Sequence, residues 1–138
     1  MEQKIVVHLK DGVIHKGITH DFEPGGKVFY LLQGEGGGVP LRVDMENMKA
    51  LFWVKDYIGN RQYVARRSFE KGDRPAERTV VTFGDGEEIW GTLTGDTDGK
   101  LGFFLIPADA EDNNIRIFVV RSALKDMRAA SGTEIGSG

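Results

Sequence analysis

The chain contains no cysteine, and none of its apolar runs is long enough to cross a bilayer. Without cysteine it forms no disulfide, thiolate metal site or thiol nucleophile, and a reducing cytoplasm is the expected compartment. Glu2, Lys4 and His8 interrupt the first apolar run, so we expect no cleaved signal peptide. We therefore expect a cytoplasmic protein that does not associate with membranes.

The chain also lacks an excess of positive charge. The formal net charge is −3 over 138 residues, so the protein lacks the global positive field that would attract nucleic acid by counterion release. Any anion site must be local. With 40% hydrophobic and 28% charged residues, the composition is that of a folded globular protein and not of a disordered chain.

The sequence states one pattern twice. The segment 4–19, KIVVHLKDGVIHKGIT, is matched by 78–93, RTVVTFGDGEEIWGTL. The same step aligns Leu41–Val43 with Ile115–Ile117. This duplication predicts two very small domains instead of one larger domain. The positions identical 74 residues apart include Asp11 and Asp85, Gly12 and Gly86, and Gly17 and Gly91.

Alternating apolar residues and turn signals predict five short strands in each repeat. Asp-Gly marks the first hairpin, and the glycine five residues later indicates a sharp bend or a close backbone approach at a barrel corner. A single helical turn is expected before the last strand. The expected strands are 5–10, 13–19, 28–32, 39–43 and 50–54, then 78–83, 89–94, 101–106, 115–120 and 126–128.

The predicted fold is therefore mostly β, with two tandem five-stranded SH3-like small barrels. We expect the first barrel repeat at 1–54, a polar linker at 55–77, the second barrel repeat at 78–128 and a disordered tail at 129–138. Each unit is small for independent stability, which predicts an interface between the two through the aromatic ends of their last strands.

The order of strands and turns resembles the Sm-like group of small barrels. The Sm pattern D-G-x-x-x-x-G-x-[LIV] matches Asp85 to Leu93, and Val119–Ser122 is similar to the second Sm motif. This resemblance implies an RNA-binding protein centred on Arg121. It also implies a ring in which several chains pair through open strand edges, so a homo-oligomer is one expectation.

Repeat one, from Val6 to Phe22 and again near Met48–Val54, resembles an uncharacterised bacterial domain that often accompanies PilZ domains. PilZ domains bind cyclic di-GMP through R-x-x-x-R and [DN]-x-S-x-x-G, and this chain carries neither motif. The resemblance implies a place in bacterial regulation or signalling that is linked to cyclic nucleotides.

Two groups of residues are candidates for binding. Arginines beside aromatics in the linker can grip a phosphate or stack on a base, although a solvated linker packing its aromatics on the barrels is the alternative. Exposed aromatic residues can anchor a partner, because indole is favoured where apolar and wet surfaces meet. The anion candidates are Arg61, Arg66, Arg67 and Arg121; the partner-anchor candidates are Phe52, Trp53 and Trp90.

A metal site is a weak candidate. If Asp11-Gly12 is a two-residue turn, His8 lies opposite His15, and two imidazoles at that distance can hold a metal or sense pH. A solvated pair is the alternative, and no third ligand is evident, so we predict no metal and no cofactor.

The sequence carries no serine elbow, no phosphate-binding glycine loop and no carboxylate pair beside a base. We therefore predict a non-catalytic binding or adaptor module whose partner is a protein or a nucleotide. An Sm-like RNA-binding protein is the alternative.

Overall fold

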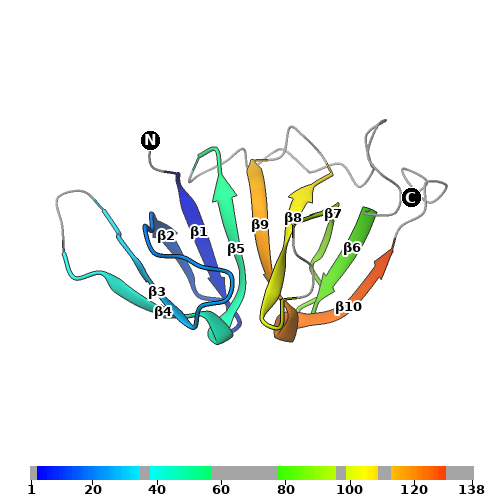
Figure 1. Cartoon of the computed structure of the whole chain (residues 1–138), viewed down its shortest axis with the longest axis horizontal. Coiled ribbons are helices and arrows are strands. Elements are labelled where there is room, and N and C mark those ends of the chain that lie inside the picture. The colour runs from blue at the N-terminus through cyan, green and yellow to red at the C-terminus, as the bar shows by residue number, and fades with distance from the viewer. Residues whose placement is uncertain (1–2, 35–37, 57–77, 96–98, 109–112, 130–138) are drawn as a thin grey trace.

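A computed structural model describes residues 3–34, 38–56, 78–95, 99–108 and 113–129. In this part of the chain ten strands and two single 3₁₀ turns alternate in the order shown in Figure 1. The first repeat holds β1 (Ile5–Leu9), β2 (Ile14–Gly17), β3 (Val28–Leu31), β4 (Leu41–Asp44), η1 (Met45–Asn47) and β5 (Met48–Val54). The second holds β6 (Arg78–Phe83), β7 (Glu88–Thr94), β8 (Gly102–Pro107), β9 (Asn114–Val120), η3 (Arg121–Ala123) and β10 (Leu124–Ala129).

The protein is mostly β, as predicted, but separate barrels are not confirmed. Eight strands form one antiparallel sheet in the order β10-β6-β7-β8-β9-β5-β1-β2, and β3 with β4 forms a second sheet. Neither sheet closes into a barrel within the described residues. Strand β5 of the first repeat pairs with strand β9 of the second repeat. The large sheet therefore continues from one repeat into the other.

Both repeats nevertheless use one strand order. In the second repeat it is β10-β6-β7-β8-β9, or fifth, first, second, third, fourth. In the first repeat β5-β1-β2 is continued by an isolated bridge between Ile18 and Leu32 to the β3-β4 pair. A single bridge, in place of a full ladder, separates the two sheets at this point.

The joint between the repeats is the pairing of β5 with β9, in the centre of Figure 1. Every residue of β5 is buried, because its two faces serve two different cores. Leu51 and Trp53 point into the first core, whereas Ala50 and Phe52 point into the second. The joint is therefore a wall shared by both cores.

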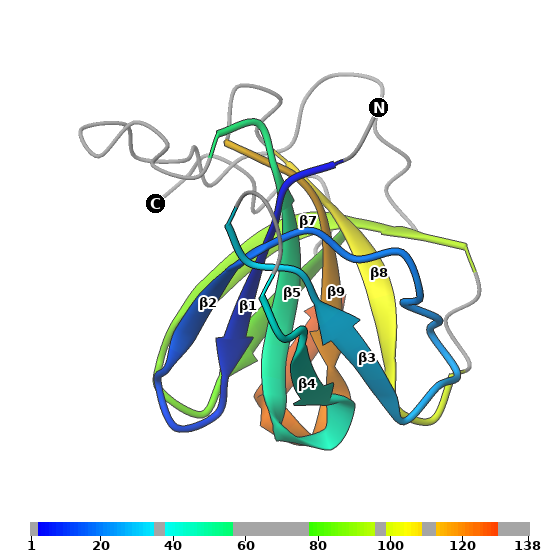
Figure 2. The same ribbon diagram turned by 90° about the vertical axis from the view of Figure 1, so that its left-hand side faces the viewer.

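Each core is completed by side chains from the other repeat. Phe118 and Val120 of β9 belong to the first core, over which β3 and β4 lie in Figure 2. Val6 and Phe52 of the first repeat belong to the second core. Since full burial of one large apolar side chain is worth roughly 1.5–3 kcal/mol, these exchanged residues bind the repeats together strongly.

The first hairpin corrects one expectation. The amide of Gly12 donates to the Leu9 carbonyl, and the φ of Gly12 is 93°, which defines a three-residue loop and not a two-residue one. The register shifts accordingly, and His8 lies opposite Ile14. His8 and His15 therefore do not face each other, so the predicted imidazole pair is wrong.

Close backbone approach at the repeated glycine is confirmed. A Cβ added to Gly17 would lie 2.3 Å from the Leu32 carbonyl oxygen, and one added to Gly91 would lie 2.5 Å from that of Ile106. No side chain fits at either position, so glycine is needed where the second strand of each repeat passes the third.

The strand pairing also corrects the alignment of the fourth strands. Phe29 pairs with Val43, and its counterpart Phe103 pairs with Val119, so Val43 corresponds to Val119 and not to Ile117. The two extra residues of repeat two thus lie before its fourth strand.

The last strand, β10, begins two residues earlier than predicted and extends to Ala129. Residues 57–77 of the predicted linker and 130–138 of the predicted tail lie outside the described residues.

Candidate binding cleft at the joint of the two repeats

A cleft of about 430 Å³ opens where a loop of repeat one meets β8 and β9 of repeat two. The loop between β2 and β3 contributes one side of it. The segment leading into β8, together with β8 and β9, contributes the rest. The lining residues are Pro24, Gly25, Gly99, Lys100, Leu101, Gly102, Phe103, Phe104 and Phe118.

Hydrogen bonds to backbone carbonyls fix the two loops that border the cleft. On the first side the Gly26 amide donates to the Glu23 carbonyl at 2.9 Å, closing a turn around Pro24 and Gly25. On the second side Arg121 acts twice: its Nε donates to the Gly99 carbonyl at 2.8 Å, and its amide donates to the Leu101 carbonyl at 2.9 Å. Both edges of the cleft are thereby held by contacts within the chain.

An aromatic cluster to which both repeats contribute lies beside the cleft. Phe22 leaves the same loop and packs edge-on against Phe118 and Trp53, with ring centroids 5.2 and 5.5 Å apart. Phe104 lies 5.2 Å from Phe118 and 5.8 Å from Trp53. The cluster therefore joins loop, shared wall and cleft into one packed unit.

Two arginines stack on aromatic residues of this region. The guanidinium of Arg116 lies 4.1 Å from the Trp53 ring centroid and 4.7 Å from that of Phe104. Burial lowers the pKa of Arg116. The guanidinium of Arg121 lies 4.9 Å from the Phe103 ring centroid. Positive charge is thus placed against two of the aromatic residues that line the cleft.

The lining determines what the cleft can do. Leu101 and Phe104 are half-buried and offer apolar surface, while Phe103 and Phe118 are buried. Lys100 is exposed and is the charged member of this lining set. A volume within roughly 300–1,000 Å³ and an apolar lining with few polar groups are typical of small-molecule sites. The arrangement can hold a ligand, and its lining has the character of a binding surface.

A second polar contact across the joint, which we call the polar clamp, is formed by Lys49, Asp85 and Glu87. Lys49 of β5 is 9% exposed; it contacts Glu87 and Asp85 of repeat two, the latter at 2.7 Å, and lies over the Phe83 ring at 4.6 Å. These hydrogen bonds raise the pKa of Lys49 against the opposing effect of burial, and Lys49 in turn lowers the pKa of Asp85.

The smaller pocket beside this clamp, about 190 Å³, is lined by Lys10, Lys49 and Asp85 among others. Lys10 donates to the Ser122 hydroxyl across the same joint. Because the charge of Lys49 is neutralised by two carboxylates, we assign these contacts to holding the repeats together.

The structure places the predicted site residues in different environments. Phe52 and Trp53 are 4% and 7% exposed, so their surface is already covered within the chain. Trp90 is half-buried, and its indole Nε1 donates to Glu88 at 2.7 Å. Arg121 borders the cleft. Arg61, Arg66 and Arg67 lie outside the described residues.

The weak metal candidates are separated. His8 stacks on Phe52 with ring centroids 4.6 Å apart, and its pKa is lowered by burial. His15 pairs with Val7, one position out of register with His8. Among the described residues no group of three or more His, Asp or Glu side chains is arranged to hold a metal ion.

Sequence reasoning missed the cleft itself. Its residues come from the loop before β3 and the segment leading into β8, which are distant in the sequence and adjoin only because β9 pairs with β5. One signal was present: MKALFWV in β5 is apolar on both faces, which is the pattern of a strand buried on both sides.

Fold and cleft together define an all-β, antiparallel protein of two joined repeats with a cleft at their junction. No helix in the described residues is long and apolar enough to span a membrane. The chain belongs to the family of unknown function DUF6982, whose model matches residues 1–131. No curated protein and no solved structure matches it.

Proposed function

We propose that the chain is a non-catalytic binding module in which two SH3-like units, derived from a duplication, act as one body. The observation that carries this proposal is the cleft of about 430 Å³ to which both repeats contribute. In the described part of the chain, its lining of Phe, Leu, Pro, Gly and Lys100 supplies apolar contact and a cation, as binding sites do.

The proposed setting is bacterial regulation in the cytoplasm, linked to nucleotides or to a protein partner. The resemblance of repeat one to a domain that accompanies PilZ domains supports this setting. Self-association through the end strands of the sheets, β4 and β10, stays a prediction, as does anion binding by Arg61, Arg66 and Arg67.

Sm-like RNA binding is the second candidate, and the position of Arg121 favours it. This arginine contacts Gly99 and Phe103, both of which line the cleft. If RNA is the ligand, short single-stranded RNAs will shift in a native gel at low salt, and the shift will weaken as salt rises.

A thermal-shift screen tests the proposal. The purified chain is heated with mononucleotides, cyclic dinucleotides, short RNAs and peptides, because a ligand at 100 times its Kd stabilises the native state by roughly 2.7 kcal/mol. Gly25→Trp places an indole at the cleft, where an added Cβ meets open space, and Gly25→Ala is its matched control.

The proposal predicts a ligand whose shift is lost in Gly25→Trp and kept in Gly25→Ala. A shift lost only when Arg61, Arg66 and Arg67 are all changed to Ala would move the site to the linker. Turnover of a ligand without stable binding would contradict a non-catalytic role.

A further inference from the structure

We infer that the junction cleft takes a small planar aromatic anion of the mononucleotide type, its ring against Leu101 and Phe104 and its anionic group beside Lys100. This inference rests on the proposed function and specifies the ligand of the same cleft. It combines three features of the cleft: an apolar wall, an exposed lysine, and two arginines that lie over the rings of Phe104 and Phe103.

The apolar wall suits a flat ring. Leu101 and Phe104 are half-buried, and both pack against the first core, to which the buried Phe118 belongs. Stacking of a base on an aromatic side chain is worth roughly 1–3 kcal/mol and requires no particular hydrogen-bond pattern. A flat heteroaromatic ring therefore gains from this wall without a dedicated polar partner.

The charge of the cleft favours an anion. Lys100 is exposed, and its ammonium can reach the anionic group of a ligand without losing much of its own hydration. Among the described residues, those that line the cleft include this lysine and no acidic side chain. A phosphate beside the ring thus meets a positive rim.

The two arginines reinforce this preference. Arg116 lies 4.7 Å from the Phe104 ring centroid, and Arg121 lies 4.9 Å from that of Phe103. Both cations are fixed against the walls of the cleft, which raises the local potential although the chain carries a net charge of −3. A neutral ring gains the contact with the apolar wall but no electrostatic attraction from these cations.

The volume selects a small ligand. A cleft of about 430 Å³ lies in the lower part of the range for small-molecule sites and accommodates one ring system with its anionic group. An aromatic-acidic peptide segment offers similar chemistry on a larger scaffold. We favour the free small molecule because both loops that border the cleft are held in place by hydrogen bonds within the chain.

The experiment titrates the ¹⁵N-labelled full chain with AMP and GMP, and with adenosine and guanosine as phosphate-free controls. Lys100→Gln removes the rim charge from an exposed position, and Gly25→Trp and Gly25→Ala are the blocked cleft and its control. Circular dichroism and melting temperature establish that each variant is folded.

We expect AMP or GMP to shift the amide signals of Leu101–Phe104, with weaker binding of the nucleoside. Lys100→Gln lowers nucleotide affinity about tenfold, equivalent to about 1.4 kcal/mol, and leaves nucleoside affinity unchanged. Gly25→Trp abolishes binding of both, and Gly25→Ala binds like the original chain.

Three results overturn the inference. The first is no amide shift with any mononucleotide up to about 10 mM, weaker than any useful affinity. The second is nucleotide binding that Lys100→Gln leaves unchanged. The third is binding of a peptide or RNA, but of no mononucleotide, that Gly25→Trp abolishes; this leaves the binding module standing. If no ligand in the thermal-shift screen loses its binding in Gly25→Trp, the proposed binding module is overturned as well.

Discussion

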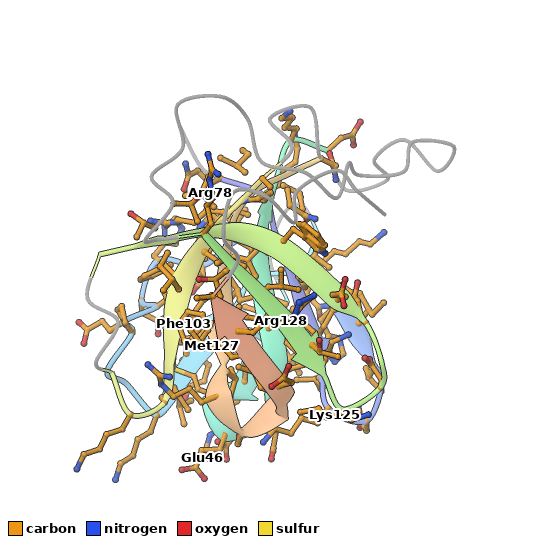
Figure 3. The ribbon with its side chains drawn as sticks, turned by 90° about the vertical axis from the view of Figure 1, so that its right-hand side faces the viewer. Glu46, Arg78, Phe103, Lys125, Met127 and Arg128 are labelled. Carbon is orange, nitrogen blue, oxygen red and sulfur yellow. The ribbon has the colours of Figure 1, made fainter. Side chains whose placement is uncertain are left out.

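Lys49 of the first repeat reaches across the joint to Asp85 of the second, with 2.7 Å between Nζ and Oδ2. The side chain of Lys49 is 11% exposed and that of Asp85 is 58% exposed, so the cation is sheltered while its partner stays hydrated. The Lys125 side chain, at the corresponding position of the exposed strand β10, points to the outside of the second repeat in Figure 3.

Lys49→Met is expected to destabilise the protein by about 1 kcal/mol. The methionine keeps most of the apolar stem, and the two carboxylates are exposed enough to be rehydrated, which limits the cost. Chemical denaturation measures the change. Lys125→Met is the matched control and should stay within about 0.5 kcal/mol; equal costs at the two positions would contradict a special role for Lys49.

Stability is expected to fall between pH 7.5 and pH 5.5 because of His8. Burial lowers the pKa of His8, while the charges of Glu87 and Asp85 raise it and that of Lys49 lowers it. The unfolded chain therefore binds the proton more readily. The stabilising contribution of neutral His8 is complete above its unfolded pKa, near 6.5, and is lost as the pH falls towards the lower folded value.

Melting temperatures across this pH range test the prediction. His8→Gln removes the titrating group and should flatten the curve, whereas His15→Gln should leave its slope in place. A slope that survives in His8→Gln would mean that another group is responsible.

Gly17→Ala and Gly91→Ala are each expected to cost about 1–3 kcal/mol, because the new methyl group forces a backbone carbonyl to move. Gly84→Ala is the control: its added Cβ would lie 3.8 Å from the nearest carbonyl oxygen, an ordinary contact. Urea titration compares the three variants. If both Gly17→Ala and Gly91→Ala change the free energy of unfolding as little as Gly84→Ala does, the second and third strands do not approach each other as closely as these distances indicate.

Much of the local structure was predictable from the sequence. Alternation located strands such as β1, in which alternate residues face the first core, and Asp-Gly located both hairpins. The type of hairpin was not predictable. A two-residue turn needs positive φ at Asp11, whereas the observed loop needs it only at Gly12, and the same dipeptide serves both. The pairing of the two strands is therefore shifted by one residue, and His8 lies opposite Ile14 instead of His15.

The joint was harder to predict because it depends on differences between the repeats. The repeat pattern treats β5 and β10 as equivalents, yet β5 carries Ala50 and Phe52 where β10 carries Asp126 and Arg128. Apolar residues on that face bury against the other repeat, and charged residues remain in water. The cleft follows from this pairing, so its residues could not be grouped without it.

We expect the two repeats to fold as one unit around the shared wall, and two tryptophans can test this directly. Trp53 reports on the first repeat and Trp90 on the second, so Trp90→Phe and Trp53→Phe each leave a single fluorescent probe. Equilibrium unfolding of both variants is followed by fluorescence and by circular dichroism. We predict that within each variant the two signals give coincident midpoints, as a single cooperative transition requires. Fluorescence and circular dichroism midpoints that separate, with one repeat unfolding while the other stays folded, would contradict the account.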